Sequence, residues 1–373
     1  MSAIAQARPM AGPGVEKVEV EVYTIPTERP ESDGTLAWSS TTMVVAHVVA
    51  GGQRGLGYTY AHAAAGRLIH EELAGVVEGR NAFDIEGSWW AMAAALRNIG
   101  RPGIGSMAIS AVDVALWDLK ARLLDVPLAG LLGQVRDAVP VYGSGGFTSL
   151  GPEEVAAQLG GWAAEGIGAV KMKIGRDATA DHDRMEAARA AIGKHGALMV
   201  DANGAYGRKE ALSVADELAS LGVTWFEEPV SSDDLAGLRL LRDRAPAPIR
   251  IAAGEYGWDA AYFRRMLEAG AVDVLQADAT RCGGISGFLR TAAVCQAYAI
   301  PLSSHCAPAL HLPASCAAEP VVHMEYFHDH VRIEQMLLDG VAQPIDGLLS
   351  PDAGRPGLGL ELREADAQRF RVT

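Results

Sequence analysis

The sequence is poor in cysteine and in net basic charge, and each shortage excludes a class of protein. Its four cysteines lack C-x-x-C spacing and are few for 373 residues, so they suggest neither a disulfide framework nor a zinc ribbon. Thirty-two basic residues stand against 46 acidic ones, and the net charge of −14 would repel nucleic acid and anionic membrane surfaces. We therefore expect reduced cysteines and no nucleic-acid partner.

Long apolar runs are also lacking. No stretch approaches the length of a bilayer-spanning helix, and Met1–Gly14 lacks the charged and apolar segments of a signal peptide. We expect a cytoplasmic protein with no membrane partner. Hydrophobic residues make up 49% and charged residues 21%, as in an ordinary folded chain, and the length predicts a barrel-sized domain with a smaller companion.

The first third of the chain has the pattern of a small α+β domain. Val18, Val20 and Val22 alternate with glutamates, which predicts a half-buried strand, and residues 41–49 and 57–60 predict two more. Apolar residues spaced by three and four over 109–123 predict a helix, after two weaker helical stretches around 64–77 and 83–97. We expect an antiparallel sheet with helices over residues 1–135.

After residue 136, short apolar runs alternate with alanine-rich helical stretches. The eight predicted strands are Val139–Ser144, Ala169–Ile174, Ala197–Asn203, Val223–Pro229, Ile249–Glu255, Val272–Asp278, Ile300–His305 and Val322–Tyr326. Strands that alternate with helices predict an α/β fold, and eight of them predict a TIM-type barrel over residues 136–345. The loop-rich residues 346–373 form a third segment whose position the pattern does not show.

Each of the last seven predicted strands ends in polar or ionisable residues. They are Lys171 and Lys173, Asp201 and Asn203, Glu227 and Glu228, Glu255, Asp278, His305, and Glu325. The carboxyl ends of barrel strands form the active-site face, so these side chains should converge. One such carboxylate could simply cap a helix or pair with a lysine. Burying so many charges at one rim is costly unless they bind a metal or one another.

Three of these carboxylates predict a metal site. Asp201, Glu227 and Glu255 come from consecutive strands and offer the hard oxygen ligands that Mg²⁺ prefers. No thiolate and few imidazoles accompany them, which argues against zinc.

The remaining residues predict acid–base chemistry. Lys171 and Lys173 point to the same face of one strand, and mutual repulsion should lower the pKa of each, so that a neutral lysine can act as a base. His305 alone could be a buried, satisfied histidine. Asp278 on the neighbouring strand favours a catalytic interpretation, because a carboxylate can orient an imidazole and raise its basicity.

Taken in order, these motifs resemble the enolase superfamily and, within it, the mandelate racemase-like subgroup. The motifs are Lys171-Met-Lys173, Asp201-Ala-Asn203, Glu227-Glu-Pro229, Gly254-Glu255, Asp278 with Gly283-Gly284, Ser304-His305 and Glu325. Muconate-lactonizing-type members usually carry an aspartate as the third metal ligand and a lysine on the sixth strand. Glu255 and Asp278 therefore indicate the racemase-like subgroup.

The resemblance implies a (β/α)7β barrel beneath an α+β capping domain, to which the C-terminal segment returns. It also implies Mg²⁺ on Asp201, Glu227 and Glu255, with Glu228 behind them, and a homo-oligomer. Lys173 would be the base on one face of a small carboxylate substrate, and the Asp278–His305 pair would serve the other face. Lys171 and a protonated, hydrogen-bond-donating Glu325 would lie beside the substrate carboxylate.

The implied chemistry is removal of the proton alpha to a carboxylate. In such enzymes magnesium stabilises the negative charge that this removal puts on the carboxylate. Loss of a β-hydroxyl then gives dehydration, whereas reprotonation gives racemisation or epimerisation. In this family the capping loops choose the substrate, together with residues such as Asn203. The stretch Glu31–Ser40 is polar around Trp38 and contains Asp33, which suits a polyhydroxylated substrate, although polar surface loops are common. A second candidate stretch is Tyr58–His62.

We therefore predict an acid-sugar (aldonate or aldarate) dehydratase, with a racemase or epimerase of a 2-hydroxy acid or related carboxylate as the alternative. A Schiff-base aldolase would also place a lysine on a barrel strand, but three carboxylates argue against it. A catalytically silent relative would not need both candidate bases. His328-Asp-His330 follows the last strand and receives no function from the sequence.

Overall fold

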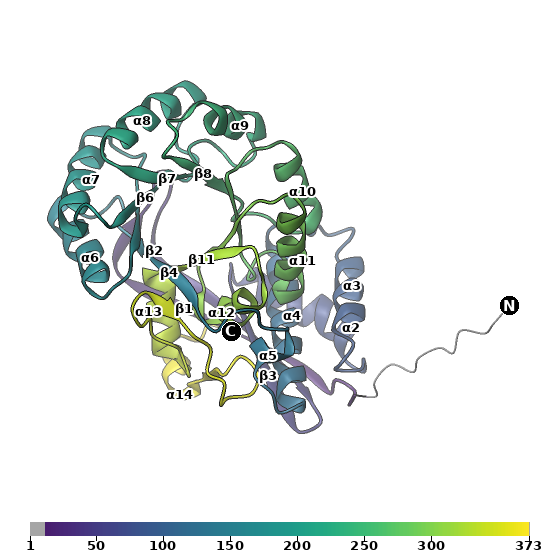
Figure 1. Cartoon of the computed structure of the whole chain (residues 1–373). Helices are drawn as coiled ribbons and strands as arrows, with labels where there is room; N and C mark the ends of the chain where they lie inside the picture. The colour runs from purple at the N-terminus through teal and green to yellow at the C-terminus, as the bar shows by residue number, and fades with distance from the viewer. Residues whose placement is uncertain (1–11, 373) are drawn as a thin grey trace.

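The computed structural model describes residues 12–372, and its centre is a closed ring of eight parallel strands (Figure 1). Each strand pairs with the next along the chain, and the last pairs with the first. The strands are β4 (Val139–Gly145), β5 (Ala169–Lys173), β6 (Ala197–Asp201), β7 (Val223–Glu227), β8 (Arg250–Ala253), β9 (Val274–Ala277), β10 (Leu302–Ser304) and β11 (Val321–Phe327). The predicted modified TIM barrel is confirmed. Met1–Ala11, on which the expectation of no signal peptide partly rests, lies outside the described residues.

Helices cover the outside of the ring, as Figure 1 shows for α6 to α11. The helices of this part are α5 (Leu128–Leu131), α6 (Pro152–Ala164), α7 (Ala178–Ile192), α8 (Arg208–Ser220), α9 (Leu235–Arg244), α10 (Ala260–Glu268), α11 (Gly284–Ala297), α12 (Pro308–Ala317) and α13 (His328–Leu337). Inside the ring, five strands contribute to a separate apolar cluster of Tyr142, Met199, Trp225, Ala252 and Val274. Across residues 12–372, no helix is both long enough and apolar enough to span a bilayer.

The predicted capping part is an antiparallel sheet with helices. It contains β1 (Lys17–Ser32), β2 (Ala37–Ala50), β3 (Gln53–Tyr60), α1 (Ala64–Leu68), the π-helical turn η1 (Ile69–Leu73), α2 (Ala74–Val77), α3 (Ile85–Ala95) and α4 (Ile104–Leu123). Helix α4 packs directly on β3. A Cβ at Gly55 or Gly57 would meet α4 carbonyl oxygens at 2.2 or 2.1 Å, so the two glycines permit this close approach.

The capping hairpin is longer than the sequence indicates. The predicted strand at residues 18–22 continues to Ser32, and β2 already begins at Ala37. Most of the predicted loop at residues 31–40 is therefore paired: Glu31 faces Trp38, beyond a register shift that begins at Pro26. A strand is normally predicted from alternating apolar and polar residues. This alternation is lost here because the segment is polar and contains two prolines and a register shift.

The cap and the barrel share hydrogen-bonded contacts. Thr59 Oγ1 donates to the carbonyl of Thr280 at 2.7 Å, and Tyr58 donates to Glu334 at 2.7 Å. Asp113 on α4 accepts from the Ser286 hydroxyl at 2.6 Å. These contacts fix the end of β3 over the carboxyl ends of the barrel strands.

The C-terminal segment runs along the barrel and then reaches the cap. Its elements are β12 (Leu338–Asp339), β13 (Leu348–Leu349), β14 (Glu361–Leu362), α14 (Glu364–Ala367) and η2 (Gln368–Phe370). β13 pairs with β4, and the backbone N–H of Val372 donates to the carbonyl of Val22 in β1 at 2.9 Å. These contacts support the expected return to the cap, while the boundaries at residues 135 and 345 stay a prediction.

Candidate active site

The side chains predicted at the strand ends lie together at the carboxyl end of the barrel. Asp201 and Glu227 are the last residues of β6 and β7, and Glu255 follows β8 by two residues. A cavity of about 700 Å³ opens between the barrel and the cap. The predicted residues in its lining are Asp33, Trp38, Lys173, Asn203, Glu255, His305 and Glu325. Those buried beside it are Lys171, Asp201, Glu227 and Asp278.

The three predicted metal ligands form one buried cluster. One oxygen from each of Asp201, Glu227 and Glu255 lies within 4.8 Å of the others. Lys171 Nζ lies 2.6 Å from Glu227 Oε1, and Lys173 binds Asp201. Among the described residues, Glu255 Oε2 accepts no hydrogen bond, so part of the buried acceptor capacity is unused.

The electrostatics of this cluster fit a hard divalent cation. Burial and the charge of Asp201 raise the pKa of Glu227 to about 8. Burial and Glu255 raise the pKa of Glu228, whose Oε1 also has no hydrogen-bond donor in the described part of the chain. An oxygen-only donor set that carries excess negative charge matches the preference of Mg²⁺.

The pKa values of the two lysines depend on the carboxylates beside them. Burial lowers the pKa of Lys173, but Asp201 outweighs it, and the net pKa is raised. The pKa of Lys171 is raised in the same way, since Glu227 and Glu325 outweigh its burial. Mutual repulsion between the two ammonium groups is thus weaker than the attraction of the carboxylates. The expected lowering also counts the charge of a bound cation on those carboxylates, and it stays a prediction.

Asp278 and His305 form the expected pair. His305 Nδ1 lies 2.8 Å from Asp278 Oδ2, and the backbone N–H of Thr280 donates to the other Asp278 oxygen at 2.7 Å. The Asp278 carboxylate accepts from Nδ1, and Nε2 lies 3.3 Å from Glu255 Oε2. Burial lowers the pKa of His305, but Glu255 and Asp278 outweigh it, and the net pKa is raised. Burial would raise the pKa of Asp278, but the hydrogen bond from His305 holds it below its usual range.

Glu325 accepts hydrogen bonds rather than donating them. The Ser144 hydroxyl donates to its Oε1 at 2.6 Å, and Lys171 Nζ lies 2.8 Å from the same oxygen. The backbone N–H of Cys306 donates to Oε2 at 2.7 Å. Burial raises the pKa of Glu325, but Lys171 and His305 outweigh it and hold the pKa below the ordinary value. The expectation of a protonated Glu325 is therefore wrong for this arrangement.

Several residues just beyond the strands have strained backbones. Asn203, Glu228, Cys306 and Ala307 have φ of 47°, 39°, 52° and 39°, the left-handed region that non-glycine residues rarely adopt. All four follow β6, β7 or β10 at the barrel mouth. Such strain persists only where surrounding contacts impose it, and it is concentrated at functional sites.

The two predicted cap residues reach the cavity, but each also supports the hairpin. Asp33 Oδ1 accepts from the backbone N–H groups of Thr35 and Leu36, both at 2.6 Å. Trp38 Nε1 donates to Glu31 at 2.9 Å, and its ring packs edge-on against Phe147 at 5.7 Å. Their contribution to substrate binding stays a prediction.

The second candidate stretch reaches the cavity through Tyr60, Ala61 and His62, and so does His330, to which the sequence assigned no function. The sequence did not single out Arg281 or Cys306 as residues of the lining. Arg281 Nη1 lies 3.4 Å from Glu255 Oε1, and the His330 ring stacks on Tyr60 at 3.5 Å. Arg281, Cys306 and His330 follow β9, β10 and β11 within a few residues. Their position directly after a barrel strand is the signal that could have identified them.

Comparison with known proteins agrees with this geometry. Residues 17–133 match the mandelate racemase / muconate lactonizing enzyme N-terminal domain, and residues 154–366 match the enolase C-terminal domain-like family. A mandelate racemase/muconate lactonizing enzyme-like protein from Rubrobacter xylanophilus is 55% identical, with a TM-score of 0.95 over 96% of this chain and 100% of that chain.

Two further relatives carry more specific descriptions. A racemase from Streptomyces coelicolor A3(2), solved with bound magnesium, is 32% identical, with a TM-score of 0.90 over 96% of this chain and all of that chain. An L-talarate/galactarate dehydratase from Salmonella typhimurium is 31% identical over 97% of this chain and 92% of its own length. The chain belongs to the mandelate racemase / muconate lactonizing enzyme family of the enolase superfamily.

Proposed function

We propose that the protein is a magnesium-dependent acid-sugar dehydratase that removes the proton alpha to a carboxylate. One observation carries this proposal. Lys173 on β5 and His305 after β10 line one cavity from strands that lie three apart one way around the ring and five apart the other. Two proton-transfer groups on separate walls, beside an oxygen-only cation site, suit abstraction at one face of a carbon and proton delivery elsewhere.

Asp201, Glu227 and Glu255 would hold the magnesium ion. Bound there, it would neutralise excess carboxylate charge and stabilise the charge that develops on a substrate carboxylate. The magnesium in the Streptomyces racemase structure supports this assignment.

The other side chains of the site would carry out proton transfer and bind the substrate carboxylate. Lys173 or His305 takes the alpha proton, according to the configuration of the substrate. Lys173 must be neutral to do so, and a cation on Asp201, Glu227 and Glu255 would offset the Asp201 charge that raises its pKa. Lys171, fixed by Glu227 and Glu325, supplies a buried ammonium for the substrate carboxylate. His305, oriented by Asp278, then protonates the leaving β-hydroxyl. It uses the alpha proton it has taken or, where Lys173 is the base, the Nε2 proton that its raised pKa retains. The alpha C–H and β C–O bonds break, water departs, and the resulting enol becomes a 2-keto-3-deoxy acid.

The cap supports an acid sugar as the substrate. Ser40, Thr41 and Thr42 place hydroxyl-bearing residues on the same cavity as Asp33 and Asn203. A cavity of about 700 Å³ lies within the size range of small-molecule sites. The Salmonella relative is a dehydratase of this substrate class.

Epimerisation of a 2-hydroxy acid is the second candidate. The same two groups could remove and return the alpha proton from opposite walls of the cavity, and the Streptomyces neighbour is described as a racemase. The two reactions diverge only after the alpha proton has left.

A screen of mono- and diacid sugars with Mg²⁺, read both for 2-keto-3-deoxy acid and for deuterium at the alpha carbon in heavy water, tests the proposal. Keto-acid accumulation supports the dehydratase. Deuterated epimer without keto acid supports the second candidate. Neither product from any acid sugar or 2-hydroxy acid would contradict both.

Two expectations from the sequence remain predictions. Homo-oligomeric assembly is checked by sedimentation velocity at several protein concentrations. The cytoplasmic location is checked by fractionating the producing cells.

A further inference from the structure

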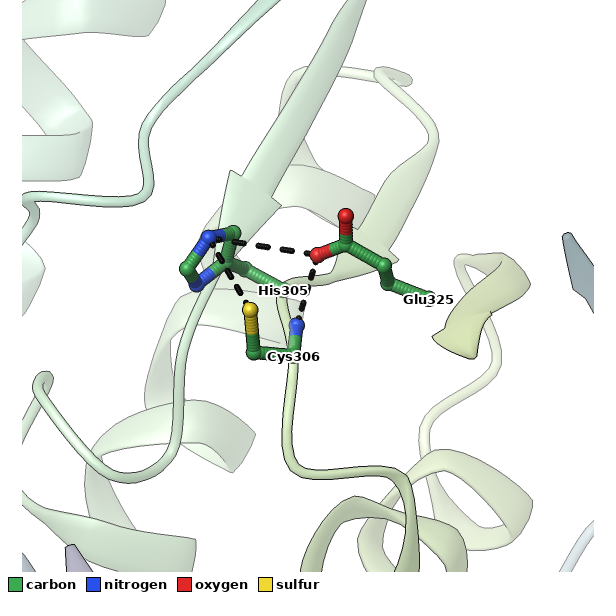
Figure 2. Close-up of side chains that lie close together, drawn as sticks. All are labelled: His305, Cys306 and Glu325. Atoms are coloured by element: carbon green, nitrogen blue, oxygen red, sulfur yellow. Dashed lines mark hydrogen bonds and ion pairs between the residues drawn. The ribbon is translucent and has the colours of Figure 1, made fainter. Parts of the chain in front are cut away.

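Three different metal-binding side chains lie together beside the proposed magnesium site. Figure 2 shows the His305 ring, the Cys306 thiol and the Glu325 carboxylate, each turned toward the others. One ligand atom from each lies within 4.8 Å of the other two, and all three residues line the cavity. His305 and Cys306 follow β10, while Glu325 comes from β11.

The distances suit a tetrahedral ion. His305 Nε2 lies 3.3 Å from Cys306 Sγ and 3.9 Å from Glu325 Oε2. Zinc bond lengths and tetrahedral angles require nitrogen–sulfur and nitrogen–oxygen separations of about 3.5 and 3.3 Å, so these two pairs need shifts of roughly half an ångström or less. The sulfur–oxygen pair, within 4.8 Å, closes to about 3.5 Å when the side chains move toward the ion.

The surrounding contacts already orient two of the ligands. Asp278 holds His305 Nδ1 at 2.8 Å, the carboxylate–histidine arrangement that typically supports a zinc-bound imidazole. Ser144 and Lys171 both contact Glu325 Oε1, and within residues 12–372 the Cys306 backbone N–H is the one hydrogen-bond donor to Oε2. His305 Nε2 also lies 3.3 Å from Glu255 Oε2, so any proton on Nε2 must leave, like the thiol proton, when a cation binds.

This donor set differs chemically from the neighbouring one. Asp201, Glu227 and Glu255 offer only hard oxygen, whereas His305 and Cys306 add nitrogen and sulfur, which favour zinc or cadmium over magnesium. The left-handed backbone at Cys306 and Ala307, with φ of 52° and 39°, places the thiol in the cavity lining.

We propose that His305 Nε2, Cys306 Sγ and Glu325 Oε2 form a second cation site that binds Zn²⁺ or a similar thiophilic divalent ion. Water or a substrate oxygen takes the fourth position, and the thiol proton passes to solvent on binding. Occupancy uses the His305 lone pair and so inhibits the enzyme. This inhibition rests on the proposed function, whereas binding does not.

Binding is tested first, by adding Cd²⁺ to protein saturated with Mg²⁺ and recording the ultraviolet charge-transfer absorption of a cadmium–thiolate bond. The wild type and Cys295→Ser, which removes a buried cysteine outside the cluster, should both show a saturable band that Zn²⁺ displaces. Cys306→Ser should lose the band. His305→Asn, read by absorption alone, should weaken cadmium affinity at least about tenfold, since even supporting groups contribute 10- to 100-fold. No band in the wild type, or a band that persists in Cys306→Ser, would overturn the site.

Inhibition is tested with Zn²⁺ under saturating Mg²⁺, with each variant compared with its own zinc-free rate. The inhibition constant should rise at least about tenfold in Cys306→Ser and stay unchanged in Cys295→Ser. Inhibition that more Mg²⁺ relieves and that Cys306→Ser leaves unaltered would place zinc on the three carboxylates and overturn the proposal. A cadmium band that depends on Cys306, without inhibition by zinc, would overturn the proposed inhibition and count against a catalytic role for His305. The binding site would still stand in that case. Failure of the site and failure of the proposed function can therefore be distinguished.

Discussion

The barrel half and the cap half of the cavity are built in different ways. On the barrel side, Lys173, Glu255, His305 and Glu325 are at most 6% exposed and are fixed by charged neighbours. On the cap side, Trp38 is only partly buried, and Leu36 is 66% exposed at the hairpin turn. In the proposed function, the strand ends would place the groups needed for proton transfer, while the protruding hairpin would meet the rest of the substrate.

This difference predicts that the barrel side sets the rate of the reaction and that the cap side sets the substrate preference. Substitutions on the barrel side should change the rate for every substrate, because every substrate presents the same alpha carbon and carboxylate. Substitutions on the cap side should change which substrate is preferred.

Removal of the divalent cation should abolish turnover for all substrates. Three buried carboxylates then repel one another, and the charge that forms on the substrate has no counter-ion. Chelation followed by a steady-state assay measures the loss, and added Mg²⁺ should restore activity. Mg²⁺ at 100 times its Kd should also raise the free energy of unfolding by about 2.7 kcal/mol. Full activity of metal-free protein or of Glu227→Ala would refute the metal assignment.

Loss of either proton-transfer group should lower turnover by roughly 10²- to 10⁴-fold. His305→Asn should block product formation yet retain solvent exchange of the alpha proton from the configuration that Lys173 serves. Lys173→Ala should show the complementary pattern. Proton NMR in heavy water measures the exchange, and the exposed Lys194→Ala is the matched control. Wild-type turnover in both variants would end the two-base interpretation.

Changes in the cap hairpin should alter preference more than rate. Trp38→Ala should change relative kcat/KM among acid sugars by about tenfold, the size of one lost contact. Asp33 needs a paired test, because it also accepts two backbone N–H groups of the turn. Asp33→Asn keeps an oxygen acceptor for those two N–H groups but removes the negative charge. If the substrate profile shifts in Asp33→Asn as well as in Asp33→Ala, the charge of Asp33 takes part in substrate binding. An unchanged profile in Asp33→Asn and Trp38→Ala would make the hairpin an ordinary surface element.

A change at Glu334, which accepts from Tyr58 of the cap, should have the smallest effect on catalysis. Its main effect should be on the pH dependence of stability. Burial raises the pKa of Glu334 to about 8, above its ordinary 4.5. Between these values the folded state holds a proton that the unfolded state has released. The free energy of unfolding should therefore fall as pH rises from about 4.5 to about 8, by an amount on the order of a few kcal/mol from this group.

Glu334→Gln should remove that share of the pH dependence. The amide can accept from the Ala309 backbone N–H and donate to the Tyr58 oxygen, so both contacts survive. Urea unfolding at several pH values measures the slope. An identical slope in the variant would show that Glu334 is ionised in the folded protein.

The sequence predicts the barrel half better than the cap half, for a physical reason. Every barrel strand places its last residue at the same rim, so strand order alone brings Asp201, Glu227 and Glu255 together. The hairpin depends on contacts between distant residues, such as Ser32 with Thr148 at 2.6 Å, which local pattern does not encode. The protein charges that raise the pKa of Lys173 and lower that of Glu325 could not be predicted from the sequence, because pKa depends on every charge nearby, and neither spacing nor residue type supplies those distances.

The hydrogen bond from Val372 to Val22 also affects the order in which the cap sheet acquires its contacts during synthesis. β1 is an edge strand of the cap sheet, and its free edge receives the end of the chain at Tyr23 and Arg371. During synthesis the N-terminal elements emerge first and can fold as a unit, but this part of the edge stays open until residues 371–372 have left the ribosome. An unpaired strand edge is a template for wrong pairing between chains. Pairing of Arg371 with Tyr23 thus closes part of this edge late, and a chain that lacks residues 371–372 leaves that part of β1 open to pairing with another chain.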